Sequence, residues 1–76
     1  MENEEKKKGE WLVSGYDPRK NCDILSYYVD GILQFTFDGY RNDRAATWRV
    51  YPRAKGLRGT QKPNVTTVCY HEAKRA

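Results

Sequence analysis

The sequence predicts an all-β domain, arranged as a small five-stranded antiparallel barrel or a two-layer sandwich. Two observations lead to this prediction. The 76 residues include two tryptophans, six tyrosines and two phenylalanines, and many threonines, valines and isoleucines accompany them, which favours strands over helices. In addition, Asp30-Gly31 joins two runs of β-forming residues, a pattern typical of a two-residue type I′ hairpin.

The hairpin at Asp30-Gly31 fixes the register of its two strands, residues 22–29 and 32–37, because facing residues are counted outward from the turn. The predicted pairs are Val29 with Ile32, Tyr28 with Leu33, Ser26 with Phe35, and Ile24 with Phe37. The face assigned to the core then carries Ile24, Tyr28, Leu33, Phe35 and Phe37. The opposite face, with Leu25 and Tyr27, is too apolar to lie wholly in water, so another strand or a partner must cover part of it.

A strand is predicted on each side of this hairpin. Residues 10–16 alternate between apolar and polar side chains around Trp11 and Val13, which predicts the first strand. The turn residues Asp38-Gly39 are expected to end the third strand in a loop.

The second half of the chain supplies the remaining strands. Residues 46–51 alternate in polarity and predict a strand, while the alternative is a short helix over residues 43–49 capped by Asn42. The segment 53–63 is rich in glycine, lysine and arginine and predicts an exposed loop. The last strand is predicted over residues 65–71.

The chain is expected to form one domain, residues 10–76, behind a disordered charged tail, residues 1–9. Neither a secretory signal nor a membrane-spanning run of apolar residues is found in the sequence. This indicates an intracellular protein if Met1 is the native start, and a secreted one if Met1 is a cloning start on a mature chain.

The two cysteines, Cys22 and Cys69, leave two interpretations open. If they pair, the disulfide closes most of the domain and contributes roughly 4 kcal/mol of stability in the chain-entropy model. If they do not pair, they are ordinary small apolar residues of an intracellular protein. A structural disulfide between Cys22 and Cys69 is therefore a possibility that the sequence does not decide.

The positive charge is concentrated in one region. The formal net charge is +4, but residues 1–43 hold nine acidic and six basic residues, whereas residues 44–71 hold six basic residues and no acidic one. Folded surfaces usually mix the two signs, so this segment indicates a polyanionic partner such as a nucleic-acid backbone. Its basic residues are Arg44, Arg49, Arg53, Lys55, Arg58 and Lys62.

Aromatic side chains near these cations suggest stacking on bases. Tyr51 is the first candidate because it projects from the same side of the predicted strand as Arg49. Tyr27 and Tyr40 are the next candidates, although Tyr27 could equally cover the second face of a thin sheet. The predicted nucleic-acid site is Arg49, Tyr51, Arg53, Lys55, Arg58 and Lys62.

Catalysis, a metal site and a small-molecule cofactor are not predicted. The chain has one histidine and no closely spaced cysteine pair, and structural zinc normally takes four ligands. His71 and Glu72 are adjacent, so on a strand they point to opposite faces and do not meet as base and acid.

The sequence therefore predicts a non-catalytic binding module whose basic, aromatic-flanked surface in residues 44–71 contacts the phosphate backbone of DNA or RNA, without a membrane. The alternative is a small secreted effector, toxin or inhibitor, stapled by Cys22 and Cys69, that binds a host protein. Its contact surface would be a strand edge or the apolar second face of the hairpin.

Overall fold

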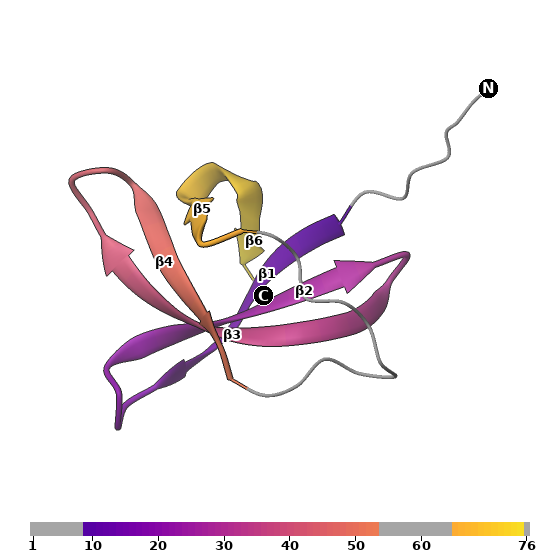
Figure 1. Ribbon diagram of the computed structural model, residues 1–76, viewed down its shortest axis with the longest axis horizontal. Helices are drawn as coiled ribbons and strands as arrows, with labels where there is room; N and C mark the ends of the chain where they lie inside the picture. The colour runs from indigo at the N-terminus through magenta and orange to yellow at the C-terminus, as the bar shows by residue number, and fades with distance from the viewer. Residues whose placement is uncertain (1–8, 54–64, 76) are drawn as a thin grey trace.

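A computed structural model describes residues 9–53 and 65–75 of the chain (Figure 1). Its elements are the strands β1 (Gly9–Asp17), β2 (Cys22–Val29), β3 (Ile32–Asn42), β4 (Thr47–Pro52), β5 (Thr67–Cys69) and β6 (Ala73–Arg75), and a 3-10 turn, η2 (Tyr70–Glu72). The predicted all-β class is confirmed. Gly9, assigned above to the tail, begins β1. The rest of the predicted tail and most of the predicted loop 53–63 lie outside the described residues.

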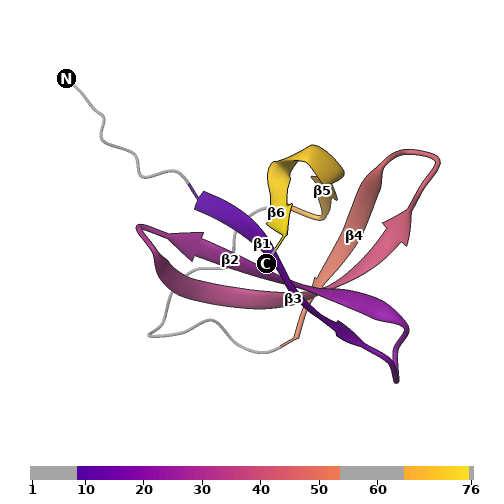
Figure 2. The same cartoon turned by 180° about the vertical axis from the view of Figure 1, so that it is seen from behind.

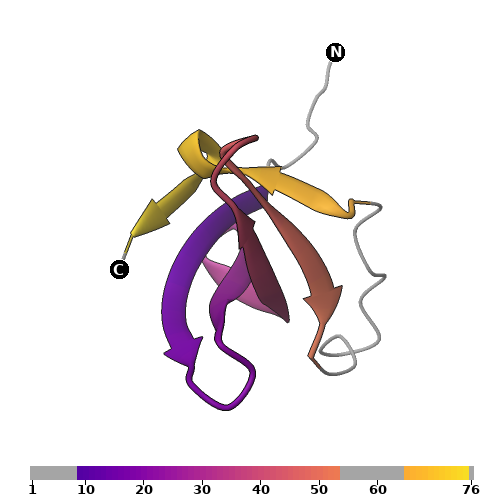
Figure 3. The same cartoon turned by 90° about the vertical axis from the view of Figure 1, so that its left-hand side faces the viewer.

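The six strands form one sheet in the order β5-β4-β3-β2-β1-β6. Strands β1 to β5 run antiparallel to their sequence neighbours, whereas β6 pairs with β1 in parallel. The sheet curls into a half-barrel, which the end-on view makes plain (Figure 3). In Figure 2, β5, η2 and β6 connect the β4 side of the sheet to the β1 side. The strand predicted over residues 65–71 is present as the shorter β5, because η2 begins at Tyr70, and it is not the last strand, since β6 follows as a sixth.

The core lies on the inner face of the curled sheet. Trp48 and Phe37 are almost fully buried, and Trp11 packs on Phe37 with ring centroids 5.2 Å apart. Tyr70 of η2 packs on Trp48 at 4.6 Å and so fastens η2 to the core. The buried apolar cluster comprises Trp11, Leu25, Phe35, Phe37, Trp48, Val50 and Val68.

The predicted hairpin forms, but its register changes part-way along. Tyr28 faces Leu33 and Val29 faces Ile32 as predicted, whereas Tyr27 faces Phe35 and Leu25 faces Phe37. A β-bulge at Gln34 accounts for the shift, because the bulge adds one residue to β3. It moves Leu25 and Tyr27 to the core face and places Ile24 and the still-buried Ser26 on the opposite face, so the predicted pairs Ser26–Phe35 and Ile24–Phe37 are wrong.

Strand β3 does not end at Asp38-Gly39 but continues to Asn42. Gly39 is buried between Leu25 and Trp48, and Asp38 on the opposite side is satisfied by Lys20 and Arg53. Inside this strand, Gly39 allows close packing and Asp38 forms ion pairs. The turn predicted at Asp38-Gly39 is therefore wrong.

Residues 47–52 form the strand β4, and the helix considered over residues 43–49 is absent from the described structure. Asn42 closes the preceding turn, since its Oδ1 accepts a hydrogen bond from the Ala45 backbone N–H at 3.3 Å. Ala46 then takes a left-handed backbone conformation with φ 56°, and its carbonyl accepts the Tyr70 N–H at 2.9 Å. These bonds hold the β3–β4 hairpin against η2.

Candidate nucleic-acid interface

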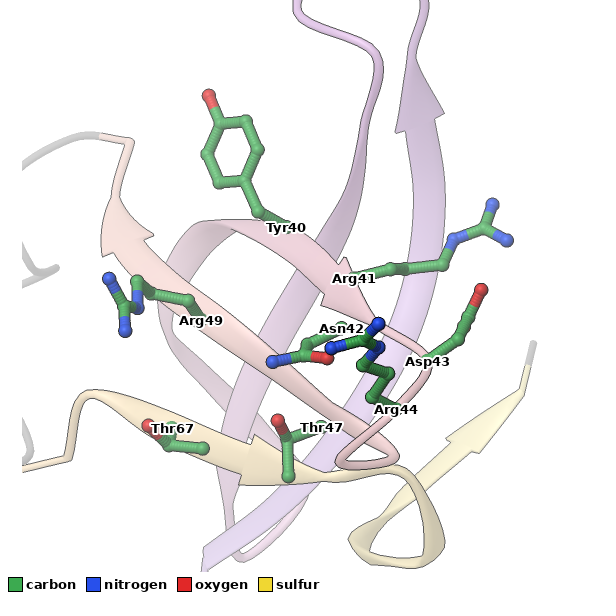
Figure 4. A pocket seen from close by; sticks show the side chains of 8 residues that line it. All are labelled: Tyr40, Arg41, Asn42, Asp43, Arg44, Thr47, Arg49 and Thr67. Atoms are coloured by element: carbon green, nitrogen blue, oxygen red, sulfur yellow. The ribbon is translucent and has the colours of Figure 1, made fainter.

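The outer face of β3, β4 and β5, which points away from the core, presents a regular grid of side chains. Tyr40 of β3, Arg49 of β4 and Thr67 of β5 are Cα partners and form one row across the three strands. Asn42 and Thr47 form the next row, and Tyr51 lies two residues beyond Arg49 on the same face. Figure 4 shows most of these side chains together.

The first hollow in this face is aromatic. Tyr40 and Tyr51 are 38% and 49% exposed, and their rings meet edge to face with centroids 5.9 Å apart. Together with Arg49 they line a shallow hollow of about 430 Å³. Burial raises the pKa of Tyr40 most, and electrostatic interactions with the neighbouring Cys22 and Asp38 raise it further. Its phenol therefore stays un-ionised at neutral pH. An open tyrosine face beside a guanidinium is suited to stacking a base.

The second hollow, also about 430 Å³, lies between the β3–β4 hairpin and β5 and shares Tyr40 and Arg49 with the first. It is polar and rich in hydrogen-bond donors. Its lining residues are Tyr40, Arg41, Asn42, Asp43, Arg44, Thr47, Arg49 and Thr67 (Figure 4). The two hollows therefore adjoin along one exposed surface.

Not every arginine of this surface is available to a ligand. Arg41 pairs with the buried carboxylate of Asp23, with Nε 3.1 Å from Oδ2. Arg44 and Arg49 form no ion pair with any residue in 9–53 or 65–75, and both are exposed. Asp43, the carboxylate in the lining, accepts a hydrogen bond from the Tyr70 hydroxyl at 2.7 Å. Arg44 and Arg49 are thus the two cations of the surface that lack an internal partner in the described structure.

Arg53 of the predicted site is placed differently. Its guanidinium pairs with Asp38, which is 5% exposed, and with Asp17 at 3.3 Å. Lys20 reaches the other oxygen of Asp38 at 2.9 Å. Because two carboxylates already neutralise Arg53, it is a structural residue in this arrangement. Lys55, Arg58 and Lys62 lie outside the described residues.

This charge cluster predicts how stability depends on pH. Burial by itself would raise the pKa of Asp38, but hydrogen bonds from Lys20 and Arg53 and their charges lower it below the ordinary 3.8. For Asp17, burial is again opposed by the Arg53 bond and by the backbone N–H groups of Lys20 and Arg19, with the same net lowering. A carboxyl group whose pKa is lower in the folded than in the unfolded state stabilises the fold at pH values above its unfolded-state pKa. This stabilisation is lost as the pH falls through the folded-state pKa.

We therefore expect the free energy of unfolding to be steady from neutral pH to about 4 and to decline below the ordinary aspartate pKa of 3.8. Urea titrations at a series of pH values measure this decline. Asp38→Asn removes one of the two titrating groups, so the acid-dependent part should be smaller in the variant. Equal declines in both proteins would show that Asp38 is not responsible.

Tyr27, the other stacking candidate, belongs to the core side. Its ring packs on Trp11 with centroids 4.9 Å apart. The bulge at Gln34 places it there. Tyr27 therefore packs against the sheet, as the alternative to base stacking supposed, but it does so on the inner face of the sheet and not on the outer face.

The cysteines are unpaired in this structure. Cys22 begins β2, and Cys69 ends β5, so β3 and β4 lie between them in the sheet. Burial raises the pKa of the Cys22 thiol, which keeps it protonated and weakly reactive. The disulfide considered from the sequence is therefore not present, and the topology of the sheet explains why.

Within the described ranges, 9–53 and 65–75, no cluster of three or more histidine, cysteine, aspartate or glutamate side chains is arranged to hold a metal ion. The same part of the chain contains no helix of the length and apolarity needed to cross a membrane. Comparisons of this chain with protein-family models, curated proteins and solved structures gave no match.

The site predicted from the sequence does not include Arg44, Thr47 and Thr67, which line the polar hollow, although Arg44 is one of the basic residues of the segment 44–71. Thr47 could have been found by counting outward from the β3–β4 hairpin, which places Asn42 opposite Thr47 and Tyr40 opposite Arg49. Thr67 could not be predicted in the same way, because its register against Arg49 depends on the connection between β4 and β5, which no local sequence pattern specifies.

Proposed function

We propose that this protein is a non-catalytic module that binds single-stranded nucleic acid on the outer face of β3, β4 and β5. Bases stack in the aromatic hollow formed by Tyr40 and Tyr51, and Arg49 and Arg44 contact the adjoining phosphates. The observation that supports this most is that the aromatic and polar hollows share Tyr40 and Arg49. The surface for a base and the surface for a phosphate are therefore adjacent, just as the base and the phosphate are close together in a nucleotide.

A single strand fits this surface better than a duplex does. Stacking on a tyrosine requires an exposed base face, which a paired duplex does not offer except at its ends. Arg49 lies on the same short stretch of sheet as the tyrosines and Arg44 lies in the adjoining β3–β4 turn, so contact with the backbone and with the base occurs together. We expect modest sequence preference because phosphate contacts and stacking do not read base edges.

Fluorescence anisotropy with labelled single-stranded DNA and RNA, and with a duplex of equal length, tests this proposal across a salt series. Tyr51→Ala should weaken single-strand binding by about tenfold, because stacking contributes roughly 1 to 3 kcal/mol per base. Arg49→Ala should reduce the salt slope by about 0.7, the value for one phosphate contact on a single strand.

Arg75→Ala is the matched control, because it removes the same charge from β6 at the opposite end of the strand order. It should leave the salt slope closer to that of the unaltered protein than Arg49→Ala does. Equal effects of the two arginine variants would mean that only net charge matters, and duplex binding as tight as single-strand binding would contradict stacking. Absence of binding at low salt would instead favour an acidic protein partner.

A further inference from the structure

We propose that the polar hollow between the β3–β4 hairpin and β5 is a site for one phosphoryl group, so that a nucleoside monophosphate is the smallest complete ligand of this surface. The inference rests on the proposed function and specifies its ligand. The phosphate would occupy the side of the hollow formed by Arg44, Thr47, Arg49 and Thr67, and the base would lie on Tyr40 and Tyr51.

The strand register gathers the donors of this site. Thr67 is the direct partner of Arg49 across β4 and β5, and Thr47 precedes Arg49 by two residues on the same face. Two hydroxyls and a guanidinium from adjacent strands therefore point to one side of the sheet. Figure 4 shows Thr47, Arg49 and Thr67 on the same side of the hollow.

The β3–β4 hairpin supplies two further donors. The Asn42 Oδ1 accepts the Ala45 N–H, which fixes the amide and leaves its nitrogen on the side of the hollow toward Arg49 (Figure 4). Arg44 extends from the turn beside Asn42. The turn itself is held by the Tyr70 N–H, which donates to the Ala46 carbonyl. The Asn42 amide and the turn that carries Arg44 are therefore held by contacts that need no ligand.

The arrangement of charge favours a phosphoryl group over a cation. Asp43, the acid in the lining, lies on the Arg41 side and accepts the Tyr70 hydroxyl. Arg41 is itself paired with Asp23. The lining of the hollow also includes the Arg44 and Arg49 guanidinium groups, the Thr47 and Thr67 hydroxyls and the Asn42 amide, all able to donate. A phosphoryl group has several acceptor oxygens in a tetrahedral array and can satisfy such a set.

The size of the surface supports a nucleotide as the ligand. Each hollow measures about 430 Å³, which is more than one phosphate group requires, and Arg49 lines both. A sugar joining base and phosphate would lie over Arg49. Adenosine alone would fill only the aromatic side, and inorganic phosphate only the polar side.

Titrations of the ¹⁵N-labelled protein with AMP, adenosine and inorganic phosphate, followed by NMR amide shifts, test this inference. AMP should bind more tightly than either part alone. Thr67→Val should lower AMP affinity about fivefold and Arg44→Ala about tenfold, the losses expected for a neutral and a charge-assisted hydrogen bond to the phosphate. Neither variant should change the binding of adenosine. Thr66→Val is the matched control, since Thr66 is one residue away and does not line the hollow.

The outcomes separate this inference from the proposed function. If single strands bind through Tyr51 and Arg49 while Thr67→Val and Arg44→Ala behave like Thr66→Val, the phosphoryl site is wrong and the interface stands. If AMP and phosphate shift the Arg44 and Thr67 amides but no oligonucleotide binds, the phosphoryl site stands and the nucleic-acid proposal fails. Amide shifts no larger than those caused by chloride at equal ionic strength would refute the site.

Discussion

Gly39→Ala is expected to destabilise the domain by about 2 to 3 kcal/mol, the upper part of the range for overpacking a core. A Cβ atom at this position would clash with Leu25 Cδ1 and lie 3.2 Å from Trp48 Cδ1. Leu25 and Trp48 are 0% and 1% exposed, so neither side chain has free space into which it can move. Urea denaturation monitored by circular dichroism measures the loss, which is a large share of a small domain's stability.

Gly15→Ala is the matched control for this substitution. Its Cβ would meet Ile24 at 3.7 Å, which is ordinary van der Waals contact. The replacement also reduces the entropy of the unfolded chain, so we expect a change between zero and a gain of about 1 kcal/mol. Equal losses for the two alanine variants would mean that the close packing at Gly39 is not the cause.

Trp48→Phe is expected to destabilise the domain by about 2 to 4 kcal/mol, from lost packing and a lost buried hydrogen bond. The Trp48 Nε1–H donates to Asp23 Oδ2 at 2.8 Å, and Asp23 is 8% exposed. Phenylalanine keeps an aromatic ring but leaves the Asp23 carboxylate with Arg41 as its remaining side-chain partner in the described structure. Chemical denaturation again gives the measurement.

Trp11→Phe removes a similar volume without that hydrogen bond. Trp11 packs on Tyr27 and Phe37, and its indole N–H has no hydrogen-bond partner among residues 9–53 and 65–75. We expect a smaller loss, about 1 to 2 kcal/mol, because only packing changes. Should Trp11→Phe prove the more damaging variant, the buried bond to Asp23 would not contribute as argued.

The sequence was most informative where interactions are local. The Asp30-Gly31 turn and the strand predicted over residues 46–51 follow from turn chemistry and alternation, and both occur, the strand as β4 over Thr47–Pro52. The bulge at Gln34 could not be predicted, because it is favoured by placing Leu25 and Tyr27 in a core shared with distant residues. Asp38-Gly39 misled for a related reason: burial against Leu25 and Trp48, not a turn, requires glycine there.

The candidate interface was predictable in part. Arg49 and Tyr51 follow from alternation along one strand, and their exposure agrees with that reasoning. Arg53 has the same sequence character but lies beside Asp17 and Asp38, from strands that only the tertiary fold brings together. Net charge in a segment therefore did not reveal which of its cations have internal partners.

The parallel pairing of β6 with β1 has a consequence for how the half-barrel assembles. Each contact in the antiparallel series from β1 to β5 joins sequence neighbours, whereas the pairing of Trp11 with Ala73 brings together distant parts of the chain. The entropy of closing that long loop must be lost before the contact gives any stabilisation. The β3–β4 hairpin that carries Tyr40 and Arg49 can thus form early, while η2, which holds its turn through Ala46, arrives with the late-closing end. We therefore expect the outer-face residues of this hairpin to be assembled before the contacts that hold its turn.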